Sequence, residues 1–150
     1  MVELMIVVGI IAIVAGIAVP AWMRAREDSR AAAVIDEYRV TSDAFISYAT
    51  DNNNNYPPTA TALSVVPAGM NGYMPQNSTW TTSPPDGGYW WFQNPTTGPV
   101  WPGFRAYIAI SNSGLQNSSM LQIDTLLDDG NLSTGCFRLS GTNFLAYGLQ

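Results

Sequence analysis

Residues 4–23 read LMIVVGIIAIVAGIAVPAWM and contain no ionisable side chain. As an α-helix rising about 1.5 Å per residue, this run would cover about 30 Å, the thickness of the hydrocarbon core of a bilayer. A cleaved secretory signal has a basic region before a shorter apolar run, whereas Glu3 precedes this one and no Lys or Arg does. A buried helix of a soluble protein is the other alternative. We therefore predict that residues 1–23 form a helix segment for a membrane or for the core of an assembly.

Residues 24–52 change to the pattern of an amphipathic helix. The apolar stripe consists of Val34, Tyr38, Phe45 and Tyr48, which recur at helical spacings and need a partner surface. No glycine interrupts residues 21–51, and DNNNNYPP at residues 51–58 combines an Asn run with two prolines that end the helix. We expect one helix of about 50 residues and roughly 75 Å.

The remainder, residues 53–150, reads as a long connection followed by a sheet. The connection is rich in Pro, Thr, Ser, Asn and Gly, and we expect a helical turn near residues 62–66. Strand-like runs occupy residues 89–93, 104–111, 134–140 and 143–149, and residues 121–131 form either a short helix or an extended piece. The predicted fold class is α+β: a long N-terminal helix packed on a four-stranded antiparallel sheet, with 24–52 and 53–150 in one globular domain.

Composition excludes several function classes. Charged residues make up only 11% of the 150 residues, against about 25% in typical soluble domains, so we expect a membrane or an assembly to hold the chain. A net charge of −5 leaves no basic face for nucleic acid. The chain has no His and a single cysteine, Cys136, which excludes an intrachain disulfide, a Cys/His zinc site and a His-based triad. We expect neither an enzyme nor a bound cofactor.

Two further groups of residues have alternative interpretations. Oxygen ligands for Ca²⁺ are offered by Asp124, Asp128, Asp129 and Asn131, but their spacing matches no calcium-loop pattern, so we expect a plain turn and no metal. Aromatic residues gather around one hairpin, and consecutive aromatics on a strand point to both faces of its sheet. One face would cover the helix stripe and the other would meet a neighbouring subunit or a sugar. The expected surface or subunit contacts are Trp80, Trp90, Trp91 and Trp101.

Residues 1–22 combine a lone Glu3 at the head of the apolar run with Gly9 and Gly16 inside it and Pro20 near its end. This combination resembles the mature N-terminus of type IV pilins and of the pseudopilins of type II secretion. Beyond residue 52 the resemblance is one of architecture, and the Cys pair that closes the C-terminal loop of many pilins is missing. Family members have a short basic leader and, once it is cleaved, an N-methylated Phe before the Glu. We therefore expect that a leader and about two residues precede Met1 in the full protein.

The resemblance implies a subunit that polymerises through its N-terminal helix into a filament. Glu3 would pair with the N-terminal amine of its own or a neighbouring subunit, since an unpaired carboxylate in a membrane helix costs on the order of 2.5 to 3.5 kcal/mol. The helix would kink or melt near Gly16 and Pro20, because proline lacks an N–H and glycine is a poor helix former.

The implied partners are identical copies, the inner membrane before assembly, and a pilus or secretion machinery. The filament would be extracellular or periplasmic. A type II secretion pseudopilin is one alternative, and a membrane-anchored glycan-binding module is the second.

Overall fold

The computed structural model describes residues 2–94 and 103–150. Helix α1 (Val2–Asp51) is 50 residues long, which confirms the predicted single helix. The Asn run ends it, because Asn53 and Asn54 adopt positive φ angles of 54° and 61°, a left-handed conformation that asparagine tolerates. The Asn54 N–H then bonds to the Ala49 carbonyl at 2.7 Å and closes the last turn.

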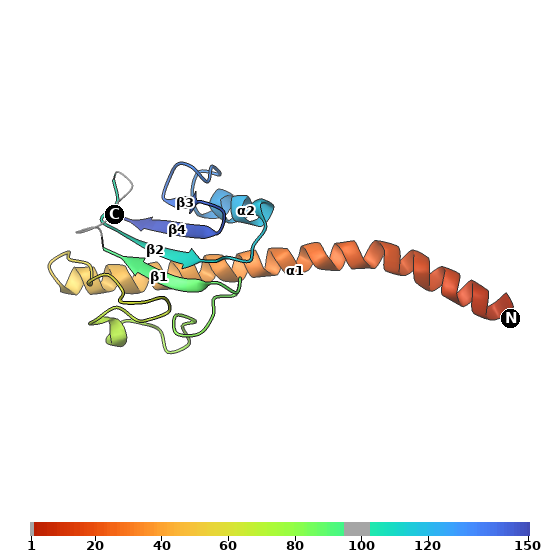
Figure 1. Ribbon diagram of the computed structural model, residues 1–150, viewed down its shortest axis with the longest axis horizontal. Helices are drawn as coiled ribbons and strands as arrows, with labels where there is room; N and C mark the ends of the chain where they lie inside the picture. The colour runs from red at the N-terminus through yellow and green to blue at the C-terminus, as the bar shows by residue number, and fades with distance from the viewer. Residues whose placement is uncertain (1, 95–102) are drawn as a thin grey trace.

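Helix α1 has a free half and a packed half (Figure 1). Its buried residues begin at Ala31, and everything described before that residue projects from the domain. The helix continues through Pro20 without a break. The globular domain therefore covers only residues 31–51 of the helix.

The remaining elements form the sheet that was predicted. Strands β1 (Tyr89–Gln93), β2 (Ala106–Ser111), β3 (Phe137–Ser140) and β4 (Phe144–Leu149) pair in the order β1-β2-β4-β3, with every neighbouring pair antiparallel. The prediction of four antiparallel strands is confirmed, although β2 and β3 begin later than expected. Helix α2 (Asn117–Leu127) connects β2 to β3 and packs beside α1, so the helical alternative for this segment holds.

The long connection before β1 differs from the expectation of a helical turn near residues 62–66. Its one helical turn is the 3₁₀-helix η1 (Met70–Gly72). The segment before η1 instead runs along β1, where the N–H groups of Ala60 and Ser64 bond to the carbonyls of Phe92 and Trp90. These bonds occupy the free edge of β1, which would otherwise offer unpaired backbone groups to another strand.

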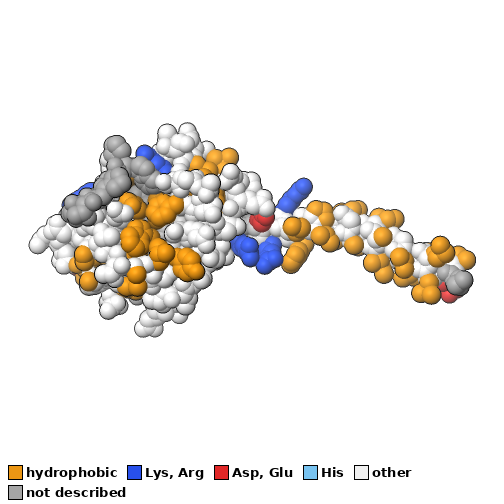
Figure 2. Space-filling model, in the orientation of Figure 1, with side chains coloured by type: hydrophobic (Ala, Val, Ile, Leu, Met, Phe, Trp, Pro, Cys, Tyr) orange, Lys and Arg blue, Asp and Glu red, His pale blue; other side chains and the backbone are white. Residues whose placement is uncertain are grey.

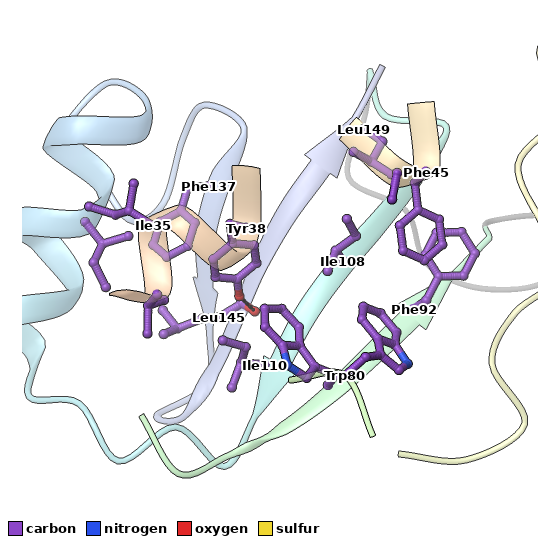
Figure 3. Close-up of a cluster of buried hydrophobic side chains, with 14 of the residues drawn as sticks. Ile35, Tyr38, Phe45, Trp80, Phe92, Ile108, Ile110, Phe137, Leu145 and Leu149 are labelled. Carbon is purple, nitrogen blue, oxygen red and sulfur yellow. Dashed lines mark hydrogen bonds between the residues drawn. The ribbon is translucent and has the colours of Figure 1, made fainter. Parts of the chain in front are cut away.

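The core lies between α1 and one face of the sheet (Figure 3). Phe45 stacks on Phe92 with ring centroids 4.3 Å apart, and Tyr38 meets Trp90 edge to face at 5.4 Å. The fully buried large side chains on the sheet side are Trp90, Phe92, Ile108, Ile110, Phe137 and Leu145. This alternating face fixes which strand residues point toward the helix.

Candidate assembly surface

Residues 4–23 of the free half of α1 expose mostly apolar and no charged side chains, and the charged side chains of this half gather next to the domain (Figure 2). Met5 is 76% exposed, Ile17 71% and Trp22 63%. The helix is long and apolar enough to cross a membrane, a criterion that a signal sequence also satisfies. Contiguous apolar surface on this scale is unfavourable in water, so the segment requires lipid or protein around it.

Glu3 lies in the first turn of α1, at the far end of the molecule from the domain. A negative charge there interacts favourably with the helix dipole. The first amine of this sequence belongs to Met1, which lies outside the described residues. The pairing of Glu3 with an N-terminal amine therefore stays a prediction.

Gly16 and Pro20 lie inside the free half of α1. A Cβ on Gly16 would meet nothing within 4 Å, so no packing inside the described chain requires a glycine at this position. Small residues in apolar helices allow another helix to approach closely. The predicted loss of helix near these two residues concerns the assembled state and stays a prediction.

The predicted stripe of the packed half divides between two surfaces. Val34, Tyr38 and Phe45 are fully buried in the helix–sheet core. Tyr48 is only partly buried and packs instead on the long connection, where its ring meets Tyr73 edge to face at 5.3 Å. The buried face also includes small helix residues, such as Ala31 and Ala49. The predicted stripe omitted them because it was built from large apolar side chains.

The prediction of surface contacts through tryptophan needs correction at two positions. Trp80 and Trp90 are 1% and 0% exposed and stack on each other with centroids 5.4 Å apart. Both indole N–H groups have partners inside the domain, Val65 O at 2.9 Å for Trp80 and the Thr79 hydroxyl at 3.1 Å for Trp90. With ring and N–H both satisfied, these side chains belong to the core.

The opposite face of the sheet retains aromatic side chains at the surface. Figure 2 shows hydrophobic side chains gathered over β1 and β2. Trp91 is partly buried there and Tyr89 is 46% exposed. Trp101, the fourth predicted contact, lies outside the described residues.

The end of α2 and the following loop bring together the carboxylates of Asp124, Asp128 and Asp129, with one oxygen from each within 4.8 Å of the others. Asp128 accepts hydrogen bonds from the N–H groups of Cys136 and Phe137. Asp129 accepts one at 2.9 Å from the Asn131 N–H and one at 2.6 Å from the Thr134 hydroxyl. Asp128 and Asp129 therefore organise the loop between α2 and β3.

Asp124 differs from the other two carboxylates because it is fully buried and neither oxygen makes a hydrogen bond. Burial, with the nearby charges of Asp129 and Asp128, raises the pKa of Asp124 to about 6. Three carboxylates this close offer the oxygen ligands that Ca²⁺ prefers. Asp124 lies in α2 and not in the predicted turn, and the sequence spacing did not reveal its burial.

Comparisons with models of known protein families, with curated proteins and with solved structures found no match. A long apolar N-terminal helix on a four-stranded antiparallel sheet is consistent with a pilin-like fold.

Histidine and cysteine, two common catalytic residue types, are nearly absent from this chain. The sequence contains no His, and burial raises the pKa of the Cys136 thiol, which keeps it protonated and weakly nucleophilic at neutral pH. Most of the exposed large apolar side chains among the described residues lie on the free half of α1.

Proposed function

We propose that this chain is a structural subunit, without catalytic activity, of a type IV pilus-like filament. The observation that carries the proposal is the division of α1 between a half that completes the core of a small domain and a half that the domain leaves bare. Such a chain has a globular domain with its own core and a free helical segment that is stable only among apolar neighbours.

The bare half has two suitable environments, a bilayer and a bundle of identical helices. Burial of apolar surface contributes about 25 cal/mol per Å², so either environment stabilises a helix whose large side chains are mostly more than half exposed. We propose that the subunit is held in the inner membrane before assembly and that neighbouring helices then replace the lipid. Pilus or secretion machinery would carry out that transfer.

Glu3 gives the assembly a defined axial position in this proposal. Its charge at the end of an apolar run is costly unless a positive group faces it. An N-terminal amine of the same or an adjacent copy supplies that group, and pairing is possible only at one axial offset between helices.

The glycan-binding alternative loses support from the burial of Trp80 and Trp90, since two of the four tryptophans that suggested it are in the core. A type II secretion pseudopilin shares the proposed architecture and remains a variant of the same proposal. The two differ in whether the filament extends from the cell surface or stays periplasmic.

Electron microscopy of sheared surface material from cells expressing the full precursor tests the proposal. We expect thin filaments that antibodies against the globular domain decorate along their length, and none from a deletion strain. Filaments seen only when the chain is overproduced together with secretion machinery would favour the pseudopilin variant. A chain that stays monomeric in the membrane under both conditions would contradict the proposal.

A further inference from the structure

A groove of about 230 Å³ lies where the packed half of α1 meets the connection before β1. Its walls are Asp36, Glu37 and Val40 from α1 with Pro75, Asn77 and Ser78 from the connection. Val40 is 48% exposed although it is a large apolar residue on the packed half of the helix. The groove therefore combines an uncovered apolar floor with two carboxylates.

The carboxylates of the groove have no partner in the described part of the chain. Neither the Asp36 nor the Glu37 side chain makes a hydrogen bond or ion pair with any residue in 2–94 or 103–150. An arginine suits such a site, because its aliphatic stem packs on apolar surface while its planar head donates to carboxylates. Lysine is absent from this chain, so a matching segment in a second copy has to use arginine.

The free half of α1 carries a matching surface. A second groove of about 210 Å³ is lined by Val19, Trp22, Met23, Arg26, Glu27 and Arg30. Arg26 lies over the ring of exposed Trp22 at 5.6 Å, and no carboxylate among the described residues pairs with Arg26 or Arg30. With Glu27 at its edge this face keeps a net positive charge. Trp and Arg are also the residues that most often dominate protein interfaces.

No ion pair joins Arg39, which follows Asp36 by three residues on the same helix, to either carboxylate of the groove. Arg30 and Glu37 share one side of α1 but are separated by about 10 Å along the axis. Side chains on a helix tilt toward its N-terminus, so Arg30 points away from Glu37. Arg26 and Arg30 of a second chain can supply the guanidinium groups.

We propose that the groove of Asp36, Glu37 and Val40 receives the Trp22–Arg26–Arg30 face of a second copy of this chain. The inference rests on the proposed function and adds to it a specific lateral contact between subunits. Opposite charges meet at the rim, and Trp22 and Val40, which are both exposed in the single chain, cover each other.

The contact also sets an axial offset between parallel helices. Moving the centre of the Arg26–Arg30 face onto the centre of the groove requires a shift of about ten residues, or about 15 Å. The two apolar runs, each about 30 Å long, still overlap over about half their length at that offset. The lateral contact and the burial of the apolar runs are therefore compatible.

Charge exchange in the full-length chain tests the contact. We expect the double variant Asp36→Arg, Glu37→Arg to lower filament yield by about tenfold or more, and Arg26→Glu, Arg30→Glu to do the same, because like charges then face each other. The variant carrying all four substitutions should recover most of the yield. Asp43→Arg, an exposed charge change on α1 outside the groove, serves as the matched control.

Disulfide trapping gives a second readout. In a Cys136→Ala background, Trp22→Cys combined with Val40→Cys should produce a ladder of linked subunits on oxidation, whereas either cysteine alone should give no product beyond a dimer.

Normal yield from both charge variants, or a four-site variant that fails to recover while Asp43→Arg assembles, would overturn this contact and leave the proposed function standing. Failure of the unmodified chain to assemble would overturn both.

Discussion

The Tyr38 hydroxyl donates a hydrogen bond of 2.9 Å to the Leu145 carbonyl and so joins the middle of α1 to strand β4. The ring of Tyr38 also contacts Trp90 and Phe137 edge to face. Burial raises the pKa of this hydroxyl well above its usual value, so it acts as a donor throughout the accessible pH range.

Tyr38→Phe should lower the free energy of unfolding of the domain by about 1 to 2 kcal/mol, because it removes a buried hydrogen bond without changing the ring. Urea unfolding of a fragment that begins at Arg24 measures the change. Tyr89→Phe, at an exposed ring on the other face of the sheet, is the control and should change stability little. Equal stability of the two variants would mean that the Tyr38 bond contributes nothing.

The same fragment, without the apolar run, should be a soluble folded monomer, since the core uses α1 only from Ala31 onward. Phe45→Asp should unfold it by placing an unpaired charge between Phe92 and Trp80. Ile46→Asp changes the adjacent but 48% exposed residue and should leave the circular dichroism spectrum and melting temperature nearly unchanged. A folded Phe45→Asp fragment would contradict the described core.

The raised pKa of Asp124 predicts that the free energy of unfolding depends on pH. EDTA is included in the measurement so that no divalent cation occupies the carboxylates. The pKa of the Asp124 carboxyl is about 6 in the folded state and 3.8 in a model peptide, so between these values the folded state keeps a proton that the unfolded state has released. The contribution of this group to the free energy of unfolding therefore falls as the pH rises from about 4 to about 6, by about 1 to 3 kcal/mol.

Asp124→Asn should accordingly make the fragment more stable than the parent at pH 7.5, with the difference vanishing near pH 4. Asp129→Asn provides the opposite case, because the Thr134 hydroxyl and the Asn131 N–H lower the pKa of Asp129. That variant should lose stability at neutral pH. An Asp124→Asn fragment that is less stable at pH 7.5 would show that the buried carboxylate has a favourable partner.

Alanine substitutions at Gly135 and Gly141 test the loop that Asp128 organises, with Gly141 as the matched control. Both have positive φ angles, 68° and 67°, so alanine carries a similar backbone cost of about 1 kcal/mol at each. A Cβ at Gly135 would overlap the Asp128 carboxylate, whereas a Cβ at Gly141 meets nothing within 4 Å. Gly135→Ala should therefore be clearly more destabilising in thermal melts, and similar losses at the two sites would refute the close approach.

Glu3→Ala should separate assembly from folding. The substitution would leave an amine unpaired in the filament core, at a cost of several kcal/mol per subunit, while the domain begins some 40 Å away along the helix. We expect normal membrane levels and normal domain stability with few or no filaments by electron microscopy. Asp43→Ala, at an exposed position outside both grooves, is the control for loss of an acidic residue on the same helix. Abundant filaments from the Glu3→Ala strain would reject the role of Glu3.

The sequence by itself determined the elements whose signals are local. A charge-free run, a stripe at helical spacing and an Asn-Pro terminator predicted α1 to its last turn, since helix propensity, periodicity and end signals all act within a few residues. Strand-like runs of β-branched, aromatic and other apolar residues likewise predicted four strands. The length and lack of charge of residues 4–23 also predicted an apolar segment for a membrane or an assembly.

The tertiary structure decided which surfaces meet. Alternation showed that Trp90 and Trp91 point to opposite faces, but only the path of the connection, which brings Trp80 onto Trp90, decided which face became the core. The placement of β4 between β2 and β3 and the burial of Asp124 likewise depend on contacts between residues far apart in sequence. Local pattern carries no information on such contacts, because their free energy comes from surfaces that the folded chain brings together.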